Sequence, residues 1–179
     1  MISYPRLIPG IFFAVLHYLL PPYRIKGKKT MHTYSKHYFH IVFGVKYRQP
    51  LLSKPWQDDL FAVMAGIVKT KGQIPLIVNG YRDHVHLLVR MLPSMSVADL
   101  VRVVKNNSTN FVNHNGFTRK RFSWQSGYGS FTCAGSSVDN VYRYIQNQES
   151  HHREKDFEKE YKGFLRQSGI EYDPVHLFD

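Results

Sequence analysis

The chain has 179 residues, 24 of them Lys or Arg and 13 Asp or Glu, which gives a formal net charge of +11 at pH 7. Its 43% hydrophobic and 21% charged residues are typical of a globular domain and exclude a fibrous or wholly disordered chain. The positive excess favours a polyanionic partner, most often nucleic acid, although a solubilising surface is the alternative. The single cysteine, Cys133, excludes an intramolecular disulfide and favours a reducing, cytoplasmic compartment.

Residues 1–30 differ in character from the rest of the chain. The largely apolar residues 7–20 resemble the hydrophobic part of a signal peptide, but they are fewer than the roughly 20 that a membrane-spanning helix needs. A basic stretch follows them, with no small-residue cleavage site. We interpret residues 1–30 as an extension that the functional domain, residues 31–179, does not need. A membrane anchor is the alternative.

The first half of this domain shows clear periodicity. Alternating apolar residues over 38–45 predict a strand. Apolar residues at helical spacing behind Pro55 predict a helix that ends at Gly72. A strand over 74–78 then reaches Asn79-Gly80, a strong signal for a hairpin turn, and we expect its partner strand over residues 82–91.

The second half adds two helices and a strand. Ser96 and Asp99 form a capping-box pattern, which predicts a helix to about residue 111. A polar loop over 113–121 precedes a strand over 128–133, and a second capping-box pattern, Ser136 to Asp139, predicts a helix to about residue 153. The order β-α-β-β-α-β predicts an α+β fold: a ferredoxin-like antiparallel sheet with helices on one face, followed by a further C-terminal helix. Such a fold does not by itself assign a function.

Two histidines stand two residues apart in the second strand of the predicted hairpin. Residues i and i+2 of a strand point to the same face, so His84 and His86 lie on one side of the sheet and Val85 on the other. Two imidazoles on one face are half of a metal site. The alternative is a pair of polar residues on an exposed sheet face.

A tyrosine and a glutamine share one face of the last predicted helix. Tyr144 and Gln148 are about 40° apart around the helix axis, and His151 continues that face. Tyr142 falls on the apolar stripe, and we interpret it as a core residue. A tyrosine hydroxyl can attack a phosphodiester to form a covalent phosphotyrosine, and a divalent metal can neutralise the phosphate charge. An ordinary interfacial tyrosine is the alternative.

Together these motifs resemble a known family. His84-Val85-His86 matches the histidine–bulky–histidine signature of the HUH endonucleases. Residues 144–149, followed by two histidines, resemble the nucleophile helix of the single-tyrosine bacterial transposases within that group. Residues 41–48, 79–86 and 123–131 are also similar to that family, so the likeness spans about residues 31–178. Residues 132–135 depart from the serine-containing stretch expected there.

The resemblance implies a specific chemistry. Tyr144 is the expected nucleophile, and His84, His86 and Gln148 are the expected ligands of Mg²⁺ or Mn²⁺. Members of the family are homodimers that recognise hairpins at the ends of insertion sequences. They cleave single-stranded DNA through a 5′-phosphotyrosine and later rejoin the strands. Host-encoded relatives process repeated extragenic hairpins with the same chemistry. For His151, a contact to phosphate, a part in proton transfer and a solvated helix end all stay open, and His152 has no assigned role.

Single-stranded DNA is bound by basic side chains combined with aromatic stacking. The best-placed basic residues are Arg102, Lys105, Arg119, Lys120 and Arg121. Each has a solvated surface charge as its alternative. Two other classes of function compete with a transposase. A non-catalytic nucleic-acid-binding module would not need the tyrosine, the histidines and the glutamine together, and a zinc hydrolase would need a third ligand at a familiar spacing.

Overall fold

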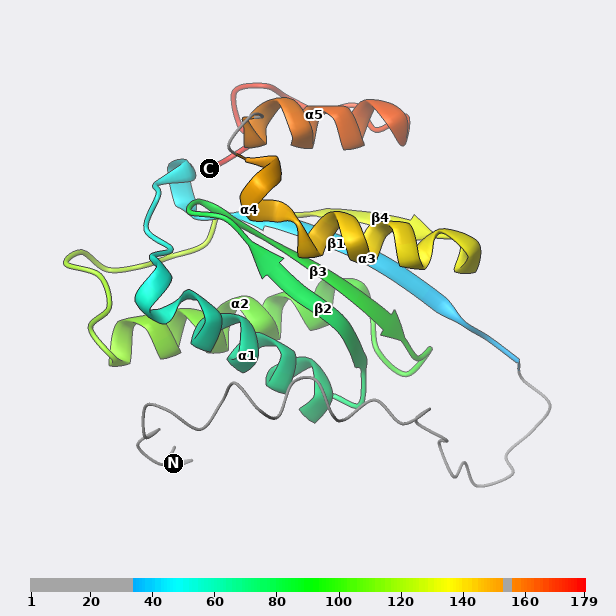
Figure 1. The fold of residues 1–179 in the computed structure, drawn as a ribbon, viewed down its shortest axis with the longest axis horizontal. Helices are drawn as coiled ribbons and strands as arrows, with labels where there is room; N and C mark the ends of the chain where they lie inside the picture. The colour runs from blue at the N-terminus through cyan, green and yellow to red at the C-terminus, as the bar shows by residue number, and fades with distance from the viewer. Residues whose placement is uncertain (1–33, 153–155) are drawn as a thin grey trace. The chain divides into compact units, whose positions relative to one another are not determined.

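The computed structural model describes residues 34–152 and 156–179 (Figure 1). The predicted domain boundary at residue 31 and the apolar stretch over residues 7–20 therefore lie outside the described residues. Within the described ranges, no helix is both long and apolar enough to span a membrane.

Four strands form one antiparallel sheet. In chain order they are β1 (His37–Gly44), β2 (Ile74–Gly80), β3 (His84–Met91) and β4 (Gly129–Cys133), and in space their order is β2-β3-β1-β4. Helix α1 (Lys54–Thr70) joins β1 to β2, and α2 (Val97–His114) joins β3 to β4. The predicted β-α-β-β-α-β order and the α+β, ferredoxin-like fold class are confirmed.

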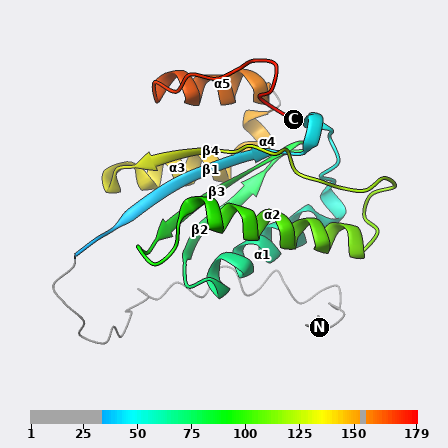
Figure 2. The ribbon, with the colours of Figure 1, turned by 180° about the vertical axis from the view of Figure 1, so that it is seen from behind.

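Helices cover both faces of this sheet. Helices α1 and α2 pack on one face, as Figures 1 and 2 show. The other face carries α3 (Val138–Gln146), the short α4 (Gln148–His151) and α5 (Phe157–Gln167). Two 3₁₀ turns, η2 (Lys46–Arg48) and η3 (Gly135–Ser137), lie in the connections.

Strand alternation divides the side chains between two layers. Phe43 of β1 and Leu87 of β3 point toward α1 and α2, where they join the main core. The residues that precede them, Val42 and His86, point to the opposite face, where Val42 packs with Phe157 and other residues of α5. Burying an apolar side chain of this size contributes roughly 1.5–3 kcal/mol, so the α1/α2 layer supplies most of the stability. The second layer is smaller and contains the polar residues of the candidate site.

The turn of the β2–β3 hairpin is not where the sequence predicts it. Asn79 and Gly80 are the last residues of β2, paired with His86 and Val85, and the connection consists of residues 81–83. The Asn79 amide donates to the backbone carbonyls of residues 145 and 146 at the end of α3 (2.7 and 3.1 Å). A Cβ at Gly80 would overlap the His84 carbonyl. Asn79 is therefore required for a tertiary contact with α3, and Gly80 for the close approach of the His84 carbonyl within the hairpin.

The helix predicted over residues 136–153 is interrupted. Helix α3 ends at Gln146 and α4 begins at Gln148, with Asn147 between them at φ −95°, ψ 21°. The expected cap at Ser136 is also absent: the residue before α3 is Ser137, and its side chain makes no capping bond. In contrast, the Ser96 cap of α2 is confirmed, because its hydroxyl accepts from the Asp99 amide (3.1 Å).

Candidate active site

Strand β3 carries both histidines of the motif on the face covered by α3, α4 and α5. His84 and His86 are each 0% exposed, so the alternative of polar residues on an exposed face is wrong. Burial of two imidazoles is costly unless their nitrogens find partners. The positions of those partners therefore indicate what the pair can do.

A carboxylate fixes the orientation of the first histidine. His84 Nδ1 lies 2.7 Å from Asp83 Oδ1, which leaves Nε2 directed toward Gln148 Oε1 at 3.3 Å. A carboxylate on one ring nitrogen is the usual support of a histidine that binds metal through the other, because it fixes the tautomer and raises the basicity of the ligand. Burial by itself raises the pKa of Asp83. The hydrogen bond to His84 and the charges of His84 and Arg48 outweigh it, so the pKa is lowered.

A third histidine supports the second one. His86 Nδ1 lies 2.9 Å from His40 Nε2 on the neighbouring strand β1, and the two rings are stacked. His86 Nε2 is buried and has no hydrogen-bond partner among the described residues. Burial lowers the pKa of His40 to about 4, and burial together with nearby histidines lowers the pKa of His86 well below its usual value. Both rings are therefore neutral at physiological pH, the state in which imidazole binds a metal.

The predicted nucleophile and the predicted amide ligand come from either side of the break between α3 and α4. Tyr144 lies in the last turn of α3, and Gln148 is the first residue of α4 and fully buried. The Tyr144 ring meets those of His86 and His151 edge-on, with centroids 5.9 and 5.2 Å apart. Its hydroxyl is buried without a hydrogen-bond partner among the described residues. The fold thus brings together the four residues predicted for catalysis and metal binding. Tyr142, predicted to be core, is only half-buried.

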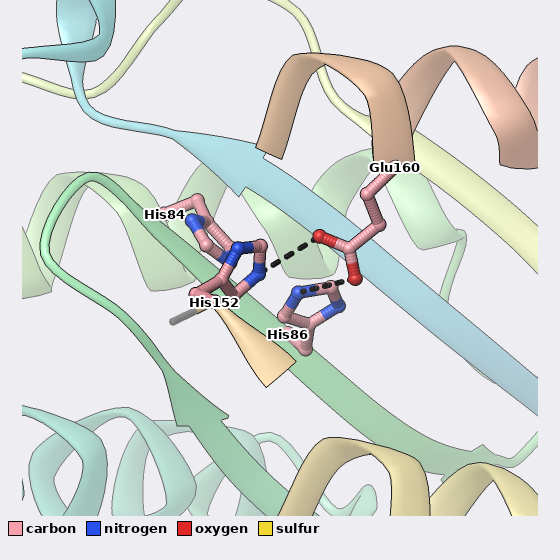
Figure 3. A group of neighbouring side chains, drawn as sticks. All are labelled: His84, His86, His152 and Glu160. Atoms are coloured by element: carbon pink, nitrogen blue, oxygen red, sulfur yellow. Dashed lines mark ion pairs between the residues drawn. The ribbon is translucent and has the colours of Figure 1, made fainter. Parts of the chain in front are cut away.

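Two further groups join the site from segments to which sequence analysis assigned no role. His152 follows α4, and Glu160 lies on α5 with its carboxylate directed at His152 and His86 (Figure 3). Glu160 Oε2 is 2.9 Å from His152 Nε2, and Glu160 Oε1 is 3.8 Å from His86 Nε2. One ligand atom from each of His84, His86, His152 and Glu160 lies within 4.8 Å of the others. This donor set, with the supported rings and the Gln148 oxygen, fits a divalent metal ion.

The predicted DNA-binding residues have different surroundings. Arg102 is exposed and pairs with Asp99 (3.0 Å), while Arg119, Lys120 and Arg121 are exposed in the loop between α2 and β4. A surface depression beside the candidate nucleophile is lined by Arg143, Tyr144, Asn147, Ser150 and His151. DNA binding by the predicted basic residues stays a prediction.

Lys105 makes contacts inside the protein. Its ammonium donates to the backbone carbonyls of residues 125, 126 and 127 (2.9, 3.2 and 2.6 Å) and lies 4.8 Å from the centre of the Phe43 ring. We expect Lys105→Met to lower the free energy of unfolding by roughly 1–3 kcal/mol, because it leaves these carbonyls without their charged donor. Urea denaturation measures the loss. Arg102→Ala on the same helix is the control, since its exposed ion pair contributes at most about 1 kcal/mol. Equal stability of Lys105→Met and wild type would contradict the anchoring role.

Two solved structures with the same fold are described as transposases. A structure of a Deinococcus radiodurans R1 protein, described as a transposase, superimposes with a TM-score of 0.55 at 23% identity and covers 68% of this chain and 98% of its own. The structure of a REP-associated tyrosine transposase bound to a REP hairpin superimposes with a TM-score of 0.50 at 15% identity. The match covers 70% of this chain and 74% of that chain. The fold is that of a tyrosine transposase.

Sequence comparison identifies the family. The profile of the family "Transposase IS200 like" matches residues 33–148. The ISDra2 transposase TnpA of Deinococcus radiodurans is 27% identical over 136 residues, which cover 73% of this chain and 96% of that protein. The transposase for insertion sequence element IS200 of Salmonella typhimurium is 26% identical over 114 residues, which cover 64% of this chain and 73% of that protein. The chain belongs to the IS200-like transposase family, a family of DNA-processing enzymes, as its motifs predict.

Proposed function

We propose that this transposase cleaves and rejoins single-stranded DNA through a 5′-phosphotyrosine on Tyr144, with a divalent metal ion. One observation carries the proposal. The Tyr144 hydroxyl is buried without a hydrogen-bond partner among the described residues, beside His84 and His86, whose rings are held by Asp83 and His40. A hydroxyl in that position would be costly in a purely structural site.

His84, His86 and Gln148 are the proposed ligands of the metal ion, Mg²⁺ or Mn²⁺. When bound, the metal supplies Lewis-acid stabilisation of the charge that develops on the phosphate. The protein fixes the donors in advance: Asp83 and His40 hold the rings, and the start of α4 holds the amide. Such preorganisation is the main electrostatic contribution that a site of this kind can make.

The transfer reaction divides into two balanced steps. In the first, Tyr144 Oη forms a bond to phosphorus, the bond from phosphorus to the 3′ oxygen breaks, and that oxygen takes up a proton to leave a 3′-hydroxyl. The tyrosine proton passes to a base, for which the adjacent imidazole of His151 is suitably placed, with ring centroids 5.2 Å apart. In the second, a 3′-hydroxyl attacks the phosphotyrosine, which restores the tyrosine and joins the strands.

The proposed partners are single-stranded DNA with hairpins at the ends of an insertion sequence and a second copy of the chain. The net charge of +11 supports a DNA partner, and the related fold described as bound to a REP hairpin supports a hairpin. We place the reaction in the cytoplasm. A host-encoded protein that processes hairpins with the same residues is the second candidate, and the DNA flanking the gene distinguishes the two.

The loop between α2 and β4 is a proposed contact to the DNA backbone. Replacing both Lys120 and Arg121 by alanine is expected to weaken binding and to reduce the slope of log K against log salt by about 1.4, because two phosphate contacts at about 0.7 each on single strands are lost. Fluorescence anisotropy at several salt concentrations measures the slope. Mn²⁺ affinity serves as the control and should not change. An unaltered slope would assign these two charges to the solvated surface.

A cleavage assay tests the proposal as a whole. Labelled single-stranded oligonucleotides that carry the hairpins flanking the gene are incubated with the protein in Mn²⁺ or in EDTA. The proposal predicts a covalent protein–DNA adduct with Mn²⁺ and none with EDTA. Tight binding of the same DNA without an adduct in either condition would instead indicate a non-catalytic binding module.

A further inference from the structure

Glu160 is a buried carboxylate on α5, outside the segment that the family profile matches. The profile ends at residue 148, whereas α5 covers residues 157–167. The Glu160 side chain is 4% exposed; its Oε2 forms an ion pair with His152, but neither oxygen has a hydrogen bond of regular geometry among the described residues. An ionised carboxylate is rarely buried in this way unless it is paired or coordinates a metal. The residues around Glu160 must therefore explain why a carboxylate is buried here.

The surroundings of this carboxylate are imidazole nitrogens. Oε1 lies 3.8 Å from His86 Nε2 and 3.7 Å from His151 Nε2, and Oε2 lies 2.9 Å from His152 Nε2. Figure 3 shows the Glu160 side chain reaching from α5 to the same place that the rings of β3 face. His86 Nε2, like the two oxygens, is buried without a hydrogen bond from the described residues.

The distances between these donor atoms are those expected for ligands of one metal ion. Nitrogen and carboxylate ligands lie about 2.0–2.2 Å from a metal such as zinc, so two donors of one ion are at most about 4.4 Å apart. The 3.8 Å separation of Glu160 Oε1 from His86 Nε2 falls within that limit, as does the 3.3 Å separation of Gln148 Oε1 from His84 Nε2. A direct Glu160–His86 hydrogen bond would need a shorter approach.

We propose that Glu160 is a fourth ligand of the metal ion, in addition to His84, His86 and Gln148, while His152 orients its second oxygen. This inference rests on the proposed function, because it takes the metal site from it. Helix α5 thereby becomes part of the metal site rather than a cover over the sheet. A donor set with two imidazoles and a carboxylate suits Mn²⁺ better than Mg²⁺, which prefers oxygen ligands in a regular octahedron.

The test is Mn²⁺ binding to the full chain after treatment with a chelator, measured by isothermal titration calorimetry in the absence of DNA. Glu160→Gln keeps the shape of the side chain but removes the charged oxygen. We expect it to weaken Mn²⁺ binding at least about 10-fold, since even outer partners of metal ligands contribute 10- to 100-fold. Glu158→Gln is the matched control on the same helix, because Glu158 pairs with Arg48 and Lys162 instead. Its Mn²⁺ affinity should stay within about twofold of wild type.

A second measurement separates ligand loss from misfolding. The Mn²⁺-induced rise in Tm is recorded for each variant against its own metal-free form, so that any loss of intrinsic stability cancels. We expect a clear rise for wild type and Glu158→Gln and a reduced one for Glu160→Gln. Wild-type affinity and Tm shift in Glu160→Gln, with both lost in His86→Ala, would overturn the role of Glu160 and leave the proposed function intact. A wild-type chain that binds no Mn²⁺ would overturn both.

Discussion

Replacing Tyr144 by phenylalanine is expected to remove the covalent protein–DNA adduct entirely while hairpin binding stays within about twofold of wild type. Phenylalanine has no oxygen to form the bond to phosphorus. The substitution leaves the ring contacts to His86 and His151 in place. It also removes a buried hydroxyl without a hydrogen-bond partner among the described residues, so the free energy of unfolding should not fall. Denaturing gel electrophoresis with labelled DNA measures the adduct.

Tyr142→Phe is the matched control for this experiment. Tyr142 lies two residues earlier on α3 and is half-buried. We expect this variant to form the adduct at a rate within about threefold of wild type. Adduct formation by Tyr144→Phe, or its loss in Tyr142→Phe alone, would move the nucleophile to another residue.

His84→Ala is expected to weaken Mn²⁺ binding at least about 100-fold and to reduce adduct formation to the level seen in EDTA. The ring is fully buried, with Nδ1 toward Asp83 and Nε2 toward Gln148, so its loss removes a donor that is already held in place. Loss of a direct ligand should exceed the 10- to 100-fold effect of losing an outer partner. Calorimetry and the gel assay measure the two effects.

An exposed histidine provides the control for this substitution. His114 ends α2, the helix on the opposite face of the sheet. His114→Ala should leave both Mn²⁺ affinity and adduct formation unchanged. A folded His84→Ala variant with wild-type Mn²⁺ affinity would show that β3 does not hold the metal, whatever the fate of Tyr144.

Strands and helices could be predicted from the sequence where the local residue pattern alone determines the structure. Alternation in β1 and β3 correctly separates Phe43 and Leu87 from His86, because the pleat alone decides which face a residue joins. The Ser96 cap was predictable because it depends on a contact three residues away. The pair Asn79-Gly80 does not form the turn, because Asn79 instead contacts α3, 66 residues later in the chain, and no local pattern reveals that contact.

The site was predictable only in part, for a related reason. Short motifs single out His84, His86, Tyr144 and Gln148, since each pair is close in sequence. The supporting His40 and the carboxylate of Glu160 reach the site through the β1–β3 register and through the packing of α5. Glu160 stands among several charged residues of an amphipathic helix, and nothing local distinguishes it from Glu158, whose side chain is only partly buried. Burial of the histidine face likewise depends on α5, so the lowered pKa of His86 could not be anticipated from the sequence.

The most direct test of the proposed function is to find which residue carries the DNA. The adduct formed with a flanking hairpin in Mn²⁺ is digested with nuclease and trypsin, and the peptide bearing the remaining nucleotide is identified by tandem mass spectrometry. Cleavage after Arg143 separates Tyr142 from the peptide of residues 144–153, in which Tyr144 is the only tyrosine. The proposal predicts a nucleotide joined through its 5′ phosphate to that peptide at Tyr144. Attachment to any other residue, or to the 3′ end of the DNA, would contradict it.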